Sequence, residues 1–248
     1  MGVVSYEPSL ALQFLGASAL SPLLSFSRSS TGMEVGADGI LRSVAANTPR
    51  FAYNPTTLQP LGLRLEQART NSATWSQDFS QAAWGAGAPT DFTVNTAGGT
   101  APDGTNTANL ITSVSAAAAT SRTWTAGGSR AAVSAFFKLG TVPAANLVVG
   151  LRNNTTATML AQTAFNGTST VGNYSIETYP NGWARISVWA TSGISAGNTL
   201  GFYWGATGAI PAGQTWYIWG GQIEDDAPSI SSYIPTVGAT ATRAQDVC

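Results

Sequence analysis

A dense run of large side chains occupies Thr215–Glu224, which reads Thr-Trp-Tyr-Ile-Trp-Gly-Gly-Gln-Ile-Glu. Large residues stand at both odd and even positions, which predicts a β-strand buried on both faces. The adjacent glycines Gly220 and Gly221 indicate a bulge or a close backbone approach inside that strand. One face can lie on the facing sheet of a sandwich. The other needs cover from loops, from an N-terminal arm or from another subunit.

Short apolar or alternating segments recur before this run, separated by clusters of Pro, Gly and Asn. Segments of this kind are typical of strands, and no long helical period or fixed repeat accompanies them. The spacing predicts an all-β fold, an antiparallel two-sheet jelly-roll sandwich with almost no helix. The predicted strands are Ala108–Ser113, Ser121–Thr125, Ala131–Leu139, Leu147–Arg152, Thr158–Phe165, Tyr174–Tyr179, Trp183–Ala190, Thr199–Trp204 and Thr215–Glu224.

The first part of the chain has weaker signals and little core of its own. Apolar residues predict strands at Ala11–Leu15 and Leu23–Ser27, and alternation predicts another at Gly62–Glu66. The Asp38-Gly39 pair between Val35 and Ile40 is typical of a tight hairpin. These short strands need a partner surface to bury their apolar side chains.

The chain therefore divides into an N-terminal β-rich arm, residues 1–70, and a jelly-roll domain, residues 71–248. The arm is expected to anchor the protein or to form the contact between subunits. One short helical turn is predicted near the start of the domain, over Asp78–Trp84, with Asp78 as its cap.

The composition narrows the functional classes. Charged residues make up only 9% of the chain and the formal net charge is −1, so no basic surface for nucleic acid or an anionic membrane is expected. Membrane insertion is not expected, because the apolar run Leu10–Leu24 is interrupted by polar residues and is too short to span a bilayer.

Histidine is absent and the single cysteine is Cys248. An intrachain disulfide, a Cys/His zinc site and Ser-His or Cys-His catalysis are therefore excluded. Only carboxylates, tyrosines and Lys138 remain for acid–base chemistry, and the acids are scattered over predicted turns. We expect no enzymatic activity; the alternative is a polysaccharide-degrading enzyme with paired carboxylates.

A series of phrases, in chain order, resembles phage virion proteins, including head and tail fibres and the head spikes of gene transfer agents. Such proteins often carry a jelly-roll module with these phrases, and the resemblance covers nearly the whole chain. The phrases are Phe26–Thr31, Asn47–Phe51, Leu65–Asn71, Asp78–Trp84, Ala101–Thr105, Tyr179–Arg185, Ile218–Glu224, Ser232–Thr236 and Thr242–Asp246. The family commonly has two acidic residues in the stretch matched by Leu65–Gln67, and Gln67 departs from that pattern.

The resemblance implies a virion location, with capsid or tail proteins as partners and a homo-oligomer, most often a trimer. The module is similar to carbohydrate-binding modules and lectin sandwiches, which implies that it binds a host cell-surface polysaccharide during adsorption. The alternative is a purely structural capsid or tail decoration protein with no ligand.

Four arginines in these phrases are expected to pin the arm to the sandwich through ion pairs. They are Arg28, Arg50, Arg69 and Arg185. The expected partners are Glu34, Glu66, Asp78 and Glu224.

A sugar site needs an aromatic face and planar polar groups. Most of the tryptophans are expected in the core, above all Trp84, Trp189, Trp216 and Trp219. Trp124 differs because Arg122 and threonines flank it, and strand alternation places Arg122 and Trp124 on one face. Arg152, in Arg152-Asn153-Asn154, and Tyr203, in Tyr203-Trp204, complete the predicted glycan-binding set.

No cofactor is expected, except that a structural calcium ion is possible at the acidic residues. Glu224 and Asp225 belong to the densest acidic run, and with Asp103 or Asp78 they are candidate ligands of a structural calcium ion, as in many jelly-roll sugar modules. The alternative is a solvated turn before Pro228.

Overall fold

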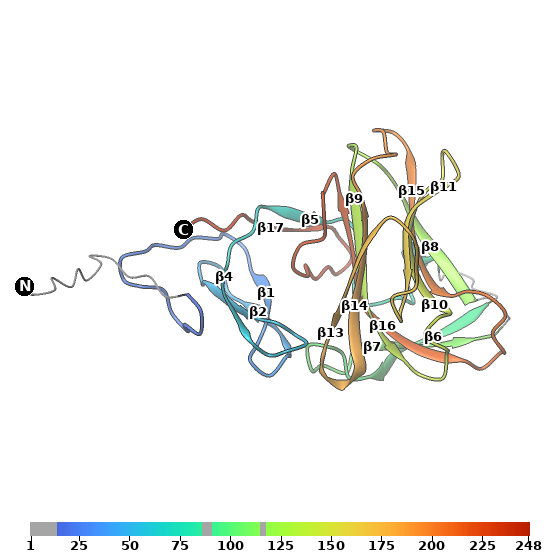
Figure 1. The fold of residues 1–248 in the computed structure, drawn as a ribbon, viewed down its shortest axis with the longest axis horizontal. Coiled ribbons are helices and arrows are strands. Elements are labelled where there is room, and N and C mark those ends of the chain that lie inside the picture. The colour runs from blue at the N-terminus through green and yellow to red at the C-terminus, as the bar shows by residue number, and fades with distance from the viewer. Residues whose placement is uncertain (1–13, 86–90, 115–117) are drawn as a thin grey trace, which may run out of the picture.

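The computed structural model describes residues 14–85, 91–114 and 118–248, and this part of the chain forms a β-sandwich with smaller ribbons beside it (Figure 1). The first sheet has the strand order β12-β11-β10-β15-β8. Its strands are β8 (Ala118–Thr125), β10 (Leu147–Asn153), β11 (Thr158–Ala164), β12 (Ser169–Val171) and β15 (Thr199–Ala206). We call it the five-stranded sheet.

The second, six-stranded sheet has the order β13-β14-β9-β16-β7-β6. Its strands are β6 (Phe92–Gly99), β7 (Ala108–Ser113), β9 (Ala131–Leu139), β13 (Asn173–Thr178), β14 (Trp183–Ala190) and β16 (Thr215–Asp225). All pairings in both sheets are antiparallel.

Three two-stranded ribbons lie beside the sandwich. They pair β1 (Gly32–Val35) with β2 (Leu41–Val44), β3 (Arg50–Tyr53) with β4 (Pro60–Arg64), and β5 (Arg69–Asn71) with β17 (Ala241–Arg243). The only helical elements in the described segments are the short 3-10 turns η1 (Ala82–Trp84) and η2 (Pro180–Gly182). No helix among the described residues is long and apolar enough to cross a membrane. The predicted all-β jelly-roll class is confirmed.

Each strand predicted for the sandwich is present, with ends that differ by at most three residues. The hairpin at Asp38-Gly39 joins β1 to β2 as predicted. The strand predicted at Leu23–Ser27 is wrong: Leu23 is exposed, and only Ser27 forms a bridge, with Val247. Of Ala11–Leu15, residues 11–13 lie outside the described residues, and Leu15 lies in an exposed turn. Within the described residues, no strand pairs with the segment from Leu23 to Phe26.

Strand β16 is buried on both faces, as its sequence predicted. Trp216 and Ile223 face the five-stranded sheet in the main hydrophobic core. Trp219 faces outward into a second core, where Met33 and Val35 of β1 cover it. Among the alternatives for the second face, the N-terminal ribbons provide the cover.

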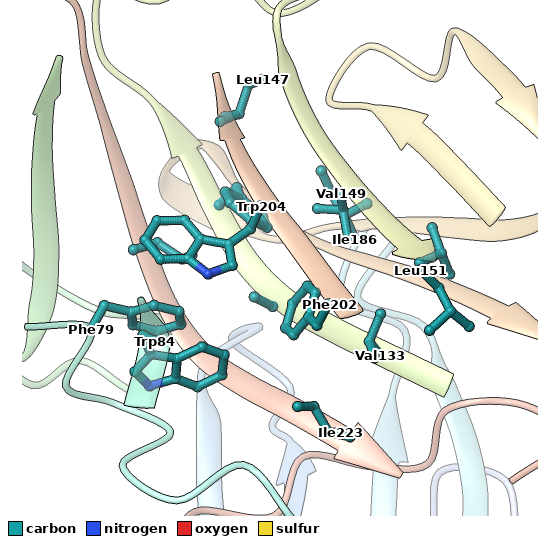
Figure 2. Packing of buried hydrophobic residues seen from close by; sticks show 14 of the residues in the cluster. Phe79, Trp84, Val133, Leu147, Val149, Leu151, Ile186, Phe202, Trp204 and Ile223 are labelled. Atoms are coloured by element: carbon teal, nitrogen blue, oxygen red, sulfur yellow. The ribbon is translucent and has the colours of Figure 1, made fainter. Parts of the chain in front are cut away.

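The main core has an aromatic group at one end (Figure 2). Phe79 stacks on Trp84 with ring centroids 4.4 Å apart, and Trp204 meets Phe79 edge-on at 5.2 Å. Aliphatic residues of the two sheets, including Val149 and Ile186, fill the remainder. The aromatic pairs add directional contacts to the burial of apolar surface.

The two glycines of β16 form the predicted bulge, because the register with β9 shifts between Trp219 and Gln222. Gly220 has a left-handed φ of 65°. A Cβ at Gly221 would overlap the ring of Trp84 and lie 3.0 Å from Cζ of Phe79. The absent side chain at residue 221 therefore lets the aromatic group pack directly against the strand.

We expect Gly221→Ala to lower the free energy of unfolding by about 1–3 kcal/mol, because the ring of Trp84 must move out of a filled core. Urea unfolding followed by tryptophan fluorescence measures this. Val237→Ala, at an exposed position, is the control and should change little. An unchanged midpoint in Gly221→Ala would contradict the packing described here.

A buried ionic cluster joins both ends of the chain to the ribbons. Asp246 binds Nη1 of Arg28 at 3.0 Å and Nη2 of Arg50 at 2.5 Å. Glu66 Oε2 binds Nη1 of Arg50 at 2.8 Å and Nη1 of Arg243 at 2.6 Å. We use the name ionic cluster for these five residues, of which only Glu66 has any appreciable side-chain exposure, 16%.

The expected ion pairs are confirmed in two cases. Arg50 binds Glu66, and Arg69 Nε lies 3.7 Å from Glu224 Oε2. For Arg28 the prediction is wrong, because it pairs with none of the four expected carboxylates and binds Asp246, a residue near the opposite end of the chain.

Three other members of the expected set have different contacts. Arg185 donates to the hydroxyl of Ser134, which lies beside it on β9. Asp78 accepts hydrogen bonds from Ser80 and Gln81 and is not the cap of η1, whose N-cap is Gln81. Glu34 makes no ion pair within the described part of the chain.

Burial alone would raise the pKa of Glu66, but Arg243, Arg64, Arg50 and the Ser232 hydroxyl together lower it to about 2. In the unfolded chain this carboxyl takes its proton near its ordinary pKa of 4.5. Its contribution to stability is therefore complete above pH 4.5 and is lost as the pH falls towards 2.

We expect Glu66→Gln to unfold more easily at neutral pH, by about 3 kcal/mol, because two buried guanidinium groups lose a partner. Its stability should also fall less steeply than the parent's as the pH drops from 4.5 to 2. Urea unfolding across this pH range tests both effects, with Glu177→Gln on an exposed strand position as the control. Equal acid slopes in parent and Glu66→Gln would refute the role of this carboxylate.

Candidate functional site

The four residues predicted to bind a glycan lie on two different faces of the five-stranded sheet. Arg122 stands opposite Phe202 and Trp124 opposite Leu200 in the β8–β15 pairing. Phe202 and Leu200 belong to the main core, so this pair shares the inward face. The shared face predicted for Arg122 and Trp124 is confirmed, but that face is not the outer surface.

Arg122 and Trp124 are built into the edge of the sandwich. Arg122 donates to the carbonyl oxygens of Ser72 and Thr74, both at 3.2 Å, and its guanidinium lies 5.2 Å from the ring centroid of Trp84. Burial lowers the pKa of Arg122. Trp124 packs against the core and donates from Nε1 to Asp225 at 3.3 Å. These contacts hold loops and strands together.

Arg152 and Tyr203 lie on the opposite, outward face of the same sheet. In the β10–β15 register Arg152 pairs with Gly201, and Tyr203 pairs with Gly150. These positions alternate with the inward pair Leu151 and Phe202, so their side chains point outward. The prediction that all four residues share one surface is therefore wrong, because the sheet lies between Arg122 with Trp124 and Arg152 with Tyr203. The binding role of each residue stays a prediction.

The ring of Tyr203 lies against the backbone of Gly201 on the surface of the sheet, and only glycine leaves room for it there. A Cβ at Gly201 would lie 2.8 Å from Tyr203 Cε2 and 3.0 Å from Asn154 Nδ2. Tyr203 Oη donates to Asn154 Oδ1 at 3.2 Å and accepts from Arg152 Nη1 at 3.5 Å. We call Arg152, Asn154 and Tyr203 the outer-face site.

The outer-face site presents a flat ring beside unpaired donors. Arg152 makes no ion pair with any described carboxylate, and its second hydrogen bond is to the carbonyl of Ala157 at 3.4 Å. Met159, on the neighbouring strand β11, lies over Gly150: a Cβ at Gly150 would be 3.3 Å from Sδ of Met159. Exposed hydroxyls lie on the same face, at Thr123, Thr125 and Thr199.

Sequence reasoning found Arg152 and Tyr203 but missed the parts that shape the surface. Gly201 and Met159 carry no local signal, because their importance comes from which residue stands opposite in the neighbouring strand. Trp204, next to Tyr203, is fully buried in the core. Among the tryptophans predicted for the core, Trp84, Trp216 and Trp219 are buried, whereas Trp189 is only half-buried.

The predicted calcium ligands do not converge. Glu224 and Asp225 are consecutive in β16 and point to opposite faces. Asp225 accepts from Trp124 and from the backbone of Gly127, while Asp103 closes its own turn by accepting from the backbone of Thr105 at 3.0 Å. No group of three potential metal ligands occurs in the described segments, so the predicted assembly of these carboxylates is wrong.

Glu224 has a different environment from that of a metal ligand. Gln222 Nε2 donates to its Oε1 at 2.5 Å, and the backbone of Ser231 donates at 3.1 Å. Burial raises the pKa of Glu224 in spite of these hydrogen bonds. The side chain therefore serves to tie the 231–232 loop to β16.

Comparisons with known proteins give weak similarities only. No protein-family model matches the chain. No curated protein matches it either. One similar solved structure is that of the Clostridium thermocellum N-terminal endo-1,4-beta-D-xylanase 10B, its CBM22-1 and GH10 modules complexed with xylohexaose, with 12% identity and a TM-score of 0.33. The match covers 84% of this chain and 30% of that one.

A second similar structure is the CBM22-1 xylan-binding domain of Paenibacillus barcinonensis Xyn10C, with 12% identity and a TM-score of 0.34. That match covers 65% of this chain and 99% of the domain. At these scores neither structure assigns a family or a ligand to this chain.

The contacts of Trp124 predict that its removal acts on stability. We expect Trp124→Ala to lower the free energy of unfolding by about 2 kcal/mol, roughly half the value for a fully buried tryptophan, because the ring is only half-buried. Urea unfolding measures this, and Thr125→Ala at the exposed neighbouring position is the control. A fully stable Trp124→Ala would mean that the ring is not part of the packing.

Proposed function

We propose that this protein binds a glycan on the outward face of its five-stranded sheet. The observation that carries the proposal is the position of Tyr203, whose ring lies over Gly201 with Arg152 and Asn154 at its hydroxyl end. A tyrosine held in this way can stack on the apolar face of a sugar ring without first losing side-chain freedom.

The polar neighbours suit the hydroxyl groups of a sugar. Arg152 offers guanidinium donors that no described carboxylate engages, and Asn154 offers an amide beside the hydroxyl of Tyr203. The same guanidinium can bind a sugar carboxylate with two parallel hydrogen bonds. Neutral and acidic glycans are therefore both within the chemistry of this site.

The finer part of the proposal is that the glycan is a host cell-surface polysaccharide and that the protein is a fibre or spike of a phage virion, which it attaches to the host during adsorption. Its support is the resemblance of the phrases from Phe26 to Asp246 to phage virion proteins. Capsid or tail proteins are the proposed partners, and a homotrimer is the proposed assembly. A shallow site buries little area, so one copy binds weakly and many copies on a particle raise the avidity.

We expect Tyr203→Ala to weaken glycan binding about tenfold or more, since the loss of an aromatic stacking contact of about 1.4 kcal/mol has this effect. Binding of the purified protein to a glycan array identifies the ligand, and titration calorimetry with that ligand gives the change in affinity. Tyr203→Phe keeps the ring and should retain most of the binding.

Tyr174→Ala, an exposed tyrosine on β13, is the matched control and should bind as the parent does. Particles that carry Tyr203→Ala should adsorb poorly to host cells at unchanged assembly. A parent protein that binds no glycan on the array would overturn the proposal and favour a structural decoration protein. Glycan binding without any effect on adsorption would overturn the adsorption role alone.

A further inference from the structure

A cavity of about 230 Å³ lies on the other side of the sandwich, between the N-terminal ribbons and the outer face of the six-stranded sheet. The ribbons contribute Glu34 and Leu61 to its wall, and β14 contributes Arg185 and Trp189. The five-stranded sheet supplies none of the lining, so this cavity is separate from the outer-face site.

Arg185 lies in the wall with guanidinium donors that the protein uses only in part, although Glu177 stands opposite it on β13. It is only 5% exposed, and Nε and Nη2 both donate to one neutral oxygen, Ser134 Oγ, at 3.3 and 3.1 Å. The guanidinium lies 5.5 Å from the ring centroid of Phe136. Within the described residues, Nη1 makes no hydrogen bond and no carboxylate lies within ion-pair distance. A buried guanidinium with one neutral acceptor retains unused donors.

Glu34 supplies an unused acceptor on the facing wall. Its Oε2 is buried and has no hydrogen-bond partner in the described segments. Burial raises the pKa of Glu34, although the backbone of Phe51 and the charge of Arg50 oppose this. The carboxyl thus takes up a proton more readily than an exposed glutamate, and can accept or donate a hydrogen bond.

Trp189 gives the cavity an aromatic wall. Its strand alternation places it outward, on the same face as Arg185, and its ring is half-buried at the cavity. Leu61 of β4 is 54% exposed beside the same cavity and adds apolar surface from the ribbon side. An aromatic wall, an unused guanidinium donor and an unused carboxyl acceptor therefore line one cavity that is open to solvent.

We propose that this cavity is a second binding site that takes a single pyranose ring, with Trp189 on the ring face, Arg185 Nη1 donating to a ring oxygen or carboxylate, and Glu34 accepting from a hydroxyl. The volume is below the range of about 300–1,000 Å³ typical of sites for drug-sized ligands, which favours one ring over a chain of sugars. The proposal rests on the proposed function only for the class of ligand. The outer-face site would bind along a glycan and the cavity would bind its end.

Binding here would also link the ribbons to the sheet, because the contributing residues come from both. A ligand that binds only the folded protein raises the apparent stability by mass action. A sugar should therefore increase the melting temperature in a concentration-dependent way.

The test uses the full chain with methyl glycosides of glucose, galactose, N-acetylglucosamine and glucuronic acid as probes. Tryptophan fluorescence and thermal unfolding report binding, in the parent and in Tyr203→Ala. We expect at least one probe to bind both proteins equally with a millimolar Kd. We expect Trp189→Leu and Glu34→Gln each to weaken that binding at least tenfold.

Asp103→Asn and Tyr174→Leu are the matched controls outside the cavity and should bind the probe as the parent does. Circular dichroism and the melting temperature without ligand confirm that each variant is folded. If Trp189→Leu proves unstable, Glu34→Gln, which preserves side-chain volume, decides the outcome alone.

The absence of binding by every probe would overturn this proposal, as would binding that neither cavity variant alters. Binding that Tyr203→Ala removes and Glu34→Gln leaves unchanged would overturn the cavity site and support the outer-face site. Binding that Glu34→Gln weakens and Tyr203→Ala leaves unchanged would support the cavity site, whatever the array shows for the outer face.

Discussion

The arrangement of the whole N-terminal part depends on the ionic cluster of Arg28, Arg50, Glu66, Arg243 and Asp246. Moving charges out of water is costly, and close partners offset that cost only when every member is in place. Asp246 meets this condition by binding two arginines, and Glu66 by binding two arginines and Ser232. The ionic cluster therefore fixes the positions of both chain ends, because a shift of either end would leave a buried charge without its partner.

Strand β16 connects the anchored ribbons to the sandwich, because it has apolar side chains on both faces. Its inward side completes the main core, and its outward side needs the ribbons as cover. The ribbons have few apolar residues of their own and rely on the cluster to hold them against Trp219 and Phe136. The cavity with Arg185 and Glu34 lies where this cover is incomplete. The cover and the cavity are therefore consequences of one strand that is apolar on both faces.

The sequence was most informative where local pattern and tertiary role agree. The bulge at Gly220 and Gly221 and the two-sided burial of β16 follow from residue order alone, as do the sandwich strands. The segment Leu23–Ser27 misled because an apolar run predicts a strand only if a partner edge exists, and that depends on the rest of the fold.

Pairing across the sheet explains the errors at the site. Alternation correctly placed Arg122 with Trp124, but which side of the sheet faces the core is set by Phe202 and Leu200 on the neighbouring strand. The partner of Arg28 was missed for the same reason, since Asp246 lies 218 residues away along the chain. Such choices depend on contacts distant in sequence, and a single sequence does not contain them.

The bridge between Ser27 and Val247 has a mechanical consequence. The chain enters and leaves the folded body side by side, with the C-terminus on the ribbon side of the molecule in Figure 1. If the chain were held near Ser27 and Val247 by another body, the pulling force would pass first through the ion pair of Arg28 and Asp246. The strands of the sandwich would bear load only after this ion pair had opened, so both sheets would keep their shape under a pull.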